Sequence, residues 1–265
     1  MTLLDELIDD LTAEGDRLRA AVAVLEEAEW ERSTPAEGWT VATQIAHLLW
    51  TDETAARAAR AHVDQATWDA IVLGAMADPG GFVDVGAHEL AGLHPDDLLT
   101  RWDAARAALV VALRELPDGQ KMPWFGPPMS AASMVTARFM ETWAHALDVY
   151  ETLGVEPDVT DRIKHVAHIG VRTRGYSFAV KELEVPTAEV RVELVAPSGE
   201  LWTWGADDAP ERLTGSAIDF CRLVTQRVHR DDTDLVAAGA GADAWLDVAQ
   251  CFAGPSGPGR EAHHG

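Results

Sequence analysis

The chain has 265 residues, of which 47% are apolar and 25% are charged, a composition typical of a globular protein with one or two domains. Its 44 acidic and 21 basic residues give a formal net charge of -23. A charge of this sign repels nucleic-acid phosphates and anionic lipid headgroups, so neither nucleic acid nor a membrane is an expected partner.

The N-terminal residues carry acids where a signal peptide needs basic residues followed by an apolar stretch, so no export signal is predicted. No apolar run approaches the roughly 20 residues that span a bilayer. The two cysteines, Cys221 and Cys251, lack a CxxC spacing and are expected to be buried, which suits a reducing compartment. These features predict a soluble cytoplasmic protein.

The first part of the chain has helical periodicity. Apolar residues recur every three or four positions over residues 3–29, and Pro35 and Gly38 then interrupt the pattern. Thr40 is placed to cap a second helix, over residues 41–62, which contains His47. Further helices are predicted over residues 67–76, 95–116, 131–153 and 161–180. The long amphipathic segments predict a helical bundle.

The periodicity changes after residue 188. Apolar and charged residues alternate over 190–194, and Pro-Ser-Gly separates this run from Leu201, Trp202 and Trp204, which predicts a β-hairpin. Helices over residues 216–229 and 242–252 follow. We therefore expect a mainly α protein with a four-helix bundle in residues 1–180, a small α+β domain in 181–253, and a disordered Gly/Pro-rich tail in 254–265.

Three residues could hold a metal ion. Glu141 and His145 are four residues apart on one predicted helix, so their side chains share a face. His47 lies in the apolar context IAHLLW, where an unpaired imidazole would be costly to bury. Two imidazoles and a carboxylate suit Zn2+ with an open position, and also accommodate Ni2+ or Fe2+.

The alternative interpretation makes His145 and His47 core histidines and Glu141 a surface acid, because an ExxxH spacing alone is common. Asp148 favours the metal, since it follows His145 by three residues and could accept the second imidazole N–H or act as a base. Asp52 either orients a ligand in the same way or belongs to a solvated helix face.

The segments GWTVATQIAHLLWTDE and ARFMETWAHALDVYETLGV resemble the DinB-like superfamily, in particular its mycothiol-dependent maleylpyruvate isomerase branch. The resemblance covers residues 1–180 and implies a four-helix bundle with His47, Glu141 and His145 as metal ligands. The region beyond resembles the smaller C-terminal domain of that branch. Three segments resemble a metal-binding subgroup of this branch rather than the isomerase itself: the PWFGPPMS loop, the predicted hairpin and the FCRLVTQRVH segment.

The resemblance implies a zinc ion that activates a low-molecular-weight thiol, mycothiol, beside a cavity for a small substrate. The candidates to line that cavity are the aromatic residues Trp50, Trp124, Phe125 and Trp143, which could instead belong to the bundle core. Arg138 is a candidate to bind a carboxylate, and the alternative places it on the surface. The resemblance also implies an arginine of the C-terminal domain that holds an anionic group. Arg227 is the candidate, although it could instead balance nearby acids.

The first hypothesis is a metal-dependent, thiol-dependent isomerase or transferase that acts on a small electrophile, with Asp148 and Arg227 as catalytic residues. A second is a thiol-independent hydrolase, lyase or cyclase of secondary metabolism that uses the metal as a Lewis acid. A third is a non-enzymatic ligand-binding protein, and a fourth is a purely structural metal site, which would need a closed coordination shell. A homodimer is compatible with each of them.

Overall fold

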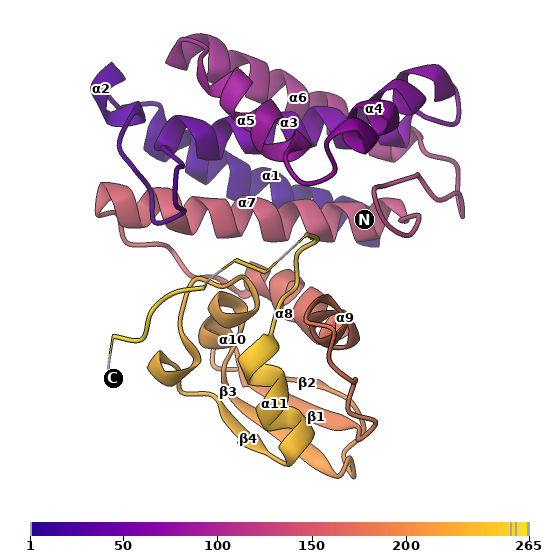
Figure 1. Cartoon of the computed structure of the whole chain (residues 1–265), viewed down its shortest axis with the longest axis vertical. Coiled ribbons are helices and arrows are strands. Elements are labelled where there is room, and N and C mark those ends of the chain that lie inside the picture. The colour runs from indigo at the N-terminus through magenta and orange to yellow at the C-terminus, as the bar shows by residue number, and fades with distance from the viewer. Residues whose placement is uncertain (1, 255, 258, 264–265) are drawn as a thin grey trace. The chain divides into compact units, whose positions relative to one another are not determined.

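The structure is a computed structural model that describes residues 2–254, 256–257 and 259–263. The chain divides into two compact units, residues 1–156 and residues 157–265. The first unit is helical, and the second combines helices with a small sheet (Figure 1). This is the mainly α architecture with an α+β C-terminal part that the sequence predicts.

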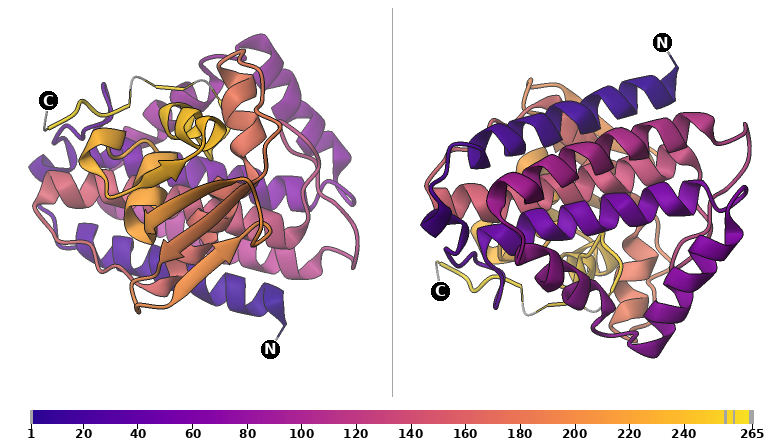
Figure 2. Two further views of the ribbon diagram at one scale, coloured as in Figure 1. Left: turned by 90° about the horizontal axis from the view of Figure 1, so that it is seen from below. Right: turned by 90° about the horizontal axis from the view of Figure 1, so that it is seen from above.

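Four long helices form the bundle of the first unit: α1 (Leu3–Val22), α3 (Val41–Ala59), α6 (Pro95–Glu115) and α7 (Ala131–Leu153). Helix α3 packs against α6 and α7, and α1 packs against α7 and α6, so the four helices lie side by side (Figure 2). The predicted four-helix bundle is therefore confirmed.

Local sequence signals fix the ends of these helices. The Thr40 side chain accepts a hydrogen bond from the backbone N–H of Thr43 at the start of α3, and Ser130 caps α7 in the same way. Helix α7 ends at Gly154, whose φ of 67° is the left-handed conformation that glycine adopts without strain. The predicted bounds of α7, residues 131–153, match the structure.

The helix predicted over residues 3–29 is not continuous, because it breaks after Val22. Helix α1 ends at Val22, and a separate short helix, α2 (Glu27–Trp30), follows. Glu26 and Glu29 form a capping box that starts this second helix, and the apolar periodicity does not reveal the break.

Two shorter helices, α4 (Gln65–Ala77) and α5 (Phe82–Ala91), connect α3 to α6. Helix α4 was expected, but α5 was not predicted. Helix α5 packs along α3, and Gly86 allows a close approach, because a Cβ at this position would lie 2.3 Å from Nε1 of Trp50. Among the described residues no single helix is long and apolar enough to cross a membrane; only α4 and α5 taken together, with a bend of 106°, have that length and composition.

The bundle core contains two apolar clusters. One includes Ile45 and Leu49 of α3 with Val149 of α7, and the other includes Ala55 of α3 with Val135 of α7. Along both helices the residues between these clusters include charged and polar side chains. The core thus leaves a polar layer in the middle of α3 and α7.

The second unit contains a four-stranded sheet with the order β2-β1-β3-β4. Strands β1 (Val190–Val195) and β2 (Leu201–Trp204) form the predicted antiparallel hairpin. Strand β3 (Glu211–Ser216) is parallel to β1, and β4 (Val236–Ala238) is antiparallel to β3. Neither β3 nor β4 was predicted, because β3 has only one buried apolar residue, Leu213, and β4 has three residues.

The helices of the second unit are shorter than predicted. The helix expected over 161–180 is divided into a 3-10 turn (Asp161–Ile163), α8 (Lys164–Arg172) and α9 (Arg174–Val180), with the break at Thr173. The Thr173 hydroxyl donates to carbonyls of its own helix and to the Gln250 carbonyl. Helix α10 (Ala217–Val224) ends early because Gln226 has a φ of 60°. The last helix is α11 (Ala240–Val248).

Helices α8 and α9 pack against α10 and α11 respectively, and this packing places them in the second unit instead of the first. The observed division follows residue 156. The predicted domains, residues 1–180 and 181–253, stay a prediction. In the predicted tail, the Ser256 hydroxyl donates to Gln250, and the backbone N–H of His263 donates to Asp232 at 2.8 Å. Residues 255, 258 and 264–265 of that tail lie outside the described residues, and its disorder stays a prediction.

Candidate metal centre

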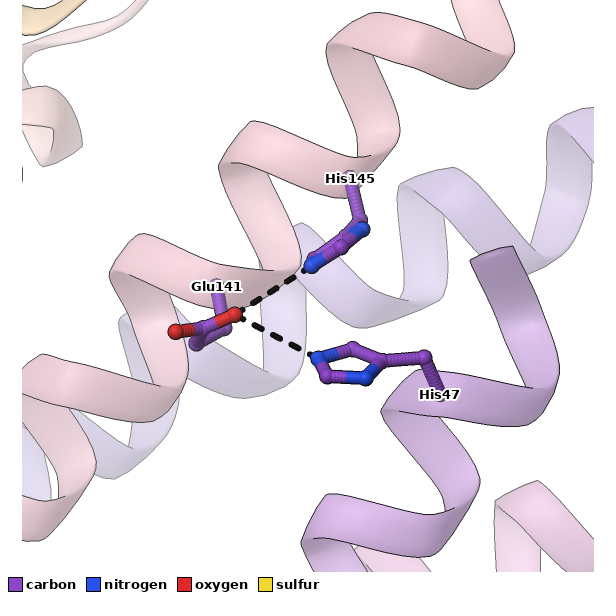
Figure 3. A group of neighbouring side chains, drawn as sticks. All are labelled: His47, Glu141 and His145. Carbon is purple, nitrogen blue, oxygen red and sulfur yellow. Dashed lines mark hydrogen bonds and ion pairs between the residues drawn. The ribbon is translucent and has the colours of Figure 1, made fainter. Parts of the chain in front are cut away.

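The middle of the bundle brings together His47, Glu141 and His145, the three residues predicted as metal ligands. Glu141 and His145 lie one turn apart on α7, and His47 faces them from α3 (Figure 3). Their potential ligand atoms all lie within 4.8 Å of one another. The spacing of four residues on one helix and the packing of α3 on α7 thus create a single cluster.

The distances within this cluster suit one small cation. Nε2 of His145 lies 3.2 Å from Oε2 of Glu141, and Nε2 of His47 lies 3.5 Å from the same oxygen. Ligands at zinc distances of about 2.0–2.1 Å, arranged as a tetrahedron, are roughly 3.3–3.4 Å apart. The side chains therefore fit a tetrahedral ion without rearrangement of the two helices.

His47 gives the second sign that an ion belongs here. The residue is 7% exposed, and neither ring nitrogen has a hydrogen-bond partner among the described residues. The 3.5 Å contact with Glu141 is too long for a strong hydrogen bond. A buried imidazole without partners costs free energy, and coordination of a cation by its Nε2 atom would offset that cost.

Glu141 is held in its charged form. Burial would raise the pKa of this carboxyl, but contacts with His145 and His47, together with their charge, outweigh burial and hold the pKa well below its usual value. The group therefore offers a carboxylate, the form that binds a metal.

Gln44 is a residue of the site that the sequence analysis missed. Its side-chain oxygen accepts a hydrogen bond from Nδ1 of His145, which leaves Nε2 of that ring facing Glu141. The Gln44 amide nitrogen donates to Thr34 Oγ1 at 2.9 Å and lies 3.5 Å from Oδ2 of Asp148. Gln44 thus occupies the orienting position that was predicted for Asp148, and Asp148 contacts Gln44.

Trp39 is the second missed residue. Its ring stacks on His145 with a centroid distance of 5.6 Å and an interplanar angle of 17°, and it contacts His47 at 5.3 Å. His88 of α5 lies at the edge of the same indole, at 6.5 Å. Trp39 precedes α3 in the GWT segment, and it covers one side of the two imidazoles.

The aromatic residues predicted to line a cavity all lie in the first unit. Trp124 and Phe125 contact each other and Trp68, and Trp50 contacts Phe82, which itself contacts Phe125. Together they form an aromatic cluster of the first unit. The remaining candidate, Trp143, is buried in the bundle with 4% of its surface exposed. A role of these residues in substrate binding stays a prediction.

Arg138 and Asp52 form a buried ion pair inside the bundle. Nε of Arg138 donates to Oδ1 of Asp52 at 2.9 Å, and Nε1 of Trp102 donates to Oδ2 at 3.1 Å. The two charged residues are 2% and 3% exposed, so neither belongs to a solvated helix face. The structure thus gives Arg138 a carboxylate partner within the chain; binding of a substrate carboxylate stays a prediction.

Arg227 lies in the second unit, just after α10. Its Nη1 donates to the Thr225 carbonyl, and its backbone N–H donates to the Arg222 carbonyl. Its predicted contact with an anionic substrate stays a prediction.

The donor set decides what chemistry the cluster can support. Among the described residues, no fourth His, Cys, Asp or Glu joins the group of His47, Glu141 and His145. Structural zinc sites usually have four protein ligands, whereas catalytic sites have three and leave one position for water or substrate. The arrangement is therefore that of a site with an open position.

Comparisons with known proteins identify the family of the chain. The family model described as "Mycothiol maleylpyruvate isomerase N-terminal domain" matches residues 11–150, more than half of the chain, and one described as "Wyosine base formation" matches residues 186–238. Two uncharacterised proteins from two strains of Mycobacterium tuberculosis are each 52% identical to the chain over 253 residues. The alignment covers 96% of this chain and 97% of each relative.

Among solved structures, the crystal structure of the mycothiol-dependent maleylpyruvate isomerase and that of a histidine-to-alanine mutant of it have the same fold. Each matches with a TM-score of 0.59 and 16% identity over 90% of this chain and 95% of the other. The match of residues 11–150 shows that the chain belongs to the mycothiol maleylpyruvate isomerase family.

Proposed function

We propose that the protein is a zinc-dependent enzyme that uses a low-molecular-weight thiol, mycothiol, to isomerise or modify a small electrophilic metabolite. The observation that carries the proposal is the cluster of His47, Glu141 and His145, in which the buried imidazole of His47 has no hydrogen-bond partner within the described part of the chain. Membership of a family named for a mycothiol isomerase supports the thiol as co-substrate. Two imidazoles and one carboxylate suit zinc, and nickel or iron are alternatives.

A metal at this site would lower the pKa of a thiol so that the nucleophilic thiolate is present at neutral pH. The chain's own residues prepare the site for it. Gln44 accepts the hydrogen bond from Nδ1 of His145, so that Nε2 of this ring faces Glu141, and Glu141 supplies negative charge between the two rings. Trp39 limits the access of water to one side of the imidazoles. We propose that Asp148 acts through Gln44, as a positioning residue.

The experiment uses the full chain loaded with Co2+, whose absorption reports its ligands. Addition of mycothiol is expected to produce a thiolate-to-cobalt charge-transfer band, whereas S-methyl mycothiol, which cannot form a thiolate, produces none. His145→Ala should abolish the band. His94→Ala, which changes an exposed histidine at the start of α6, should leave it intact.

Turnover of small electrophiles with and without mycothiol completes the test. Turnover that requires the thiol supports the proposal. Metal-dependent turnover without any thiol, and without the charge-transfer band, would instead indicate a Lewis-acid hydrolase, lyase or cyclase. A thiol band without turnover of any electrophile would indicate a binding protein.

A further inference from the structure

The second unit contains a pocket of about 430 Å³, a volume that suits a small molecule. It lies between α8, α9, β1 and α11, which Figure 1 shows within this unit. Val171, Val190 and Val192 contribute apolar side chains to its wall, and Arg174, Glu189 and Trp245 contribute polar ones. No part of the pocket belongs to the metal centre.

Arg174 presents unused hydrogen-bond donors at this pocket. Its Nη1 donates to the Pro186 carbonyl at 3.3 Å. Nε and Nη2 are buried and have no hydrogen-bond partner among the described residues. These two nitrogens form one edge of the planar guanidinium, where two parallel N–H groups can bind both oxygens of a carboxylate.

Trp245 supplies a third unused donor. The residue is 1% exposed, and its indole Nε1 also lacks a partner among the described residues. A buried N–H without an acceptor is uncommon in folded proteins, because it loses its hydrogen bond to water. Three such donors therefore belong to two neighbouring side chains that both line the pocket.

The positive charge at this pocket is incompletely compensated. Burial lowers the pKa of Arg174, and the charge of Glu211 opposes this effect only in part. Both oxygens of Glu211 already accept hydrogen bonds, from the backbone N–H groups of Gly241 at 2.9 Å and Ala242 at 2.6 Å. An arginine side chain does not lose its proton in proteins, so the buried guanidinium remains a cation that favours a further anion.

Aromatic rings hold the guanidinium in place. Its central carbon lies 5.9 Å from the ring centroids of both Phe178 and Trp245, at cation–π distance. Gly205 in the wall of the pocket has a φ of 82° and lies close to β1, because a Cβ there would lie 2.5 Å from the Val190 carbonyl. The donors are therefore positioned before a ligand binds.

From these contacts we infer that the pocket of the second unit binds a small organic carboxylate, with its two oxygens on Nε and Nη2 of Arg174 and its hydrocarbon part against Val171, Val190 and Val192. The indole N–H of Trp245 donates to one of the two oxygens. An inorganic oxyanion such as phosphate could use the same donors but would leave the three valine side chains uncovered. This inference does not rest on the proposed function.

Glu189 offers the competing explanation. It is exposed and lies at the pocket, so a change in its side-chain conformation could bring its carboxylate to Arg174. In that case the unused donors serve an ion pair within the chain. The variant Glu189→Gln separates these explanations, since it removes the internal competitor and leaves Arg174 unchanged.

The test is a titration of the ¹⁵N-labelled full chain with butyrate, followed by NMR signals of the Arg174 Nε–H and the Trp245 indole N–H. A chelator first removes any metal, so that the metal centre cannot bind the probe. Butyramide is the uncharged match of butyrate, and inorganic phosphate is the inorganic oxyanion. Arg174→Lys keeps the positive charge but removes the two parallel N–H groups of the guanidinium. Trp245→Phe removes the indole N–H and keeps an aromatic ring against Phe220. Arg172→Lys, at an exposed position nearby, is the control.

Butyrate is expected to shift both signals along one saturable curve, and butyramide and phosphate to bind more weakly. The affinity for butyrate should fall by about tenfold or more in Arg174→Lys, because a hydrogen bond to a charged group is lost. It should fall by a smaller factor in Trp245→Phe. It should stay unchanged in Arg172→Lys. Equal binding to Arg174→Lys, tighter binding of phosphate, or the absence of saturable binding would overturn the inference. Binding that appears only in Glu189→Gln would also overturn it, because Glu189 would then be the native partner of Arg174.

Discussion

The side-chain oxygen of Gln44 on α3 accepts a hydrogen bond from Nδ1 of His145 on α7. This bond ties the two helices that carry the metal centre, and it fixes which nitrogen of His145 faces Glu141. Gln44 is fully buried and is itself held by Thr34. The ring of His145 is therefore oriented before any metal binds.

Replacement of Gln44 should weaken the metal site without removing a ligand. For Gln44→Leu we expect the affinity for zinc to fall by roughly 10- to 100-fold, as is typical when the partner of a ligating histidine is lost. Competition with a chromophoric chelator measures this affinity. Gln65→Leu, at an exposed position that starts α4, is the control and should bind zinc like the native chain. Equal affinities of the Gln44 and Gln65 variants would contradict an orienting role.

Trp39 should control the rate at which the metal leaves. Its ring covers His145 at an interplanar angle of 17°, so its removal exposes the imidazole to water and to chelators. We expect Trp39→Ala to release zinc to a chelator several-fold faster in stopped-flow measurements, and Trp39→Phe to preserve most of the shielding. Trp204→Phe, in the second unit, is the control. A release rate of Trp39→Ala that matches the native rate would show that the stacked ring has no protective role.

The buried pair of Arg138 and Asp52 should dominate the stability of the polar layer. Arg138→Met leaves the Asp52 carboxylate buried without its cation, which should reduce the free energy of unfolding by about 3–5 kcal/mol. The surface pair of Arg101 with Glu53 is the control, because Arg101→Met should cost less than about 1 kcal/mol.

The double variant Asp52→Asn/Arg138→Met tests whether the loss comes from the unpaired charge. It should recover at least about 1 kcal/mol relative to the sum of the two single variants, since the Asn oxygen can still accept the bond from Trp102. Urea denaturation of the metal-free protein, followed by helical circular dichroism, measures each value. Additive losses in the double variant would exclude energetic coupling between the two residues.

The pKa of Glu141 predicts a pH dependence of the metal-free protein. Because this pKa is lowered in the folded chain, the carboxylate stabilises the fold above the unfolded value of about 4.3, and the contribution disappears as the pH falls through the folded pKa. We therefore expect native protein and Glu141→Gln to differ in unfolding free energy at pH 5, and this difference to shrink as the pH falls from the unfolded value toward the lower folded pKa. Glu37→Gln, at an exposed position, should show no such change. A difference that grows toward low pH would give the opposite sign and contradict this interpretation.

The sequence predicts the cluster of His47, Glu141 and His145 because helical spacing alone places Glu141 and His145 on one face, and an apolar context marks His47 as buried. Gln44 could have been found by the same geometry, since it precedes His47 by three residues on α3. A glutamine in a helix, however, carries no chemical signal until its partner on another helix is known. Trp39 lies outside any periodic segment, so only the folded chain shows its stacking on His145.

The same limit applies to the fold. Amphipathic periodicity and caps such as Thr40 and Ser130 predict the long helices, because each signal is local. Strand β3 escapes prediction because its place beside β1 depends on pairing between segments about twenty residues apart. The ion pair of Asp52 and Arg138 joins residues 86 positions apart, and neither residue reveals the other in the sequence.

The central claim is that His47, Glu141 and His145 hold one metal ion. Metal content, measured by mass spectrometry on the chain purified without a histidine tag, tests it most directly. The account predicts about one transition-metal ion per chain in the native protein and in the control His94→Ala. His47→Ala and Glu141→Ala should lose this ion, while their helical circular dichroism stays unchanged. Full metal occupancy in either of these two variants, or no metal in the native chain after reconstitution with zinc, would contradict it.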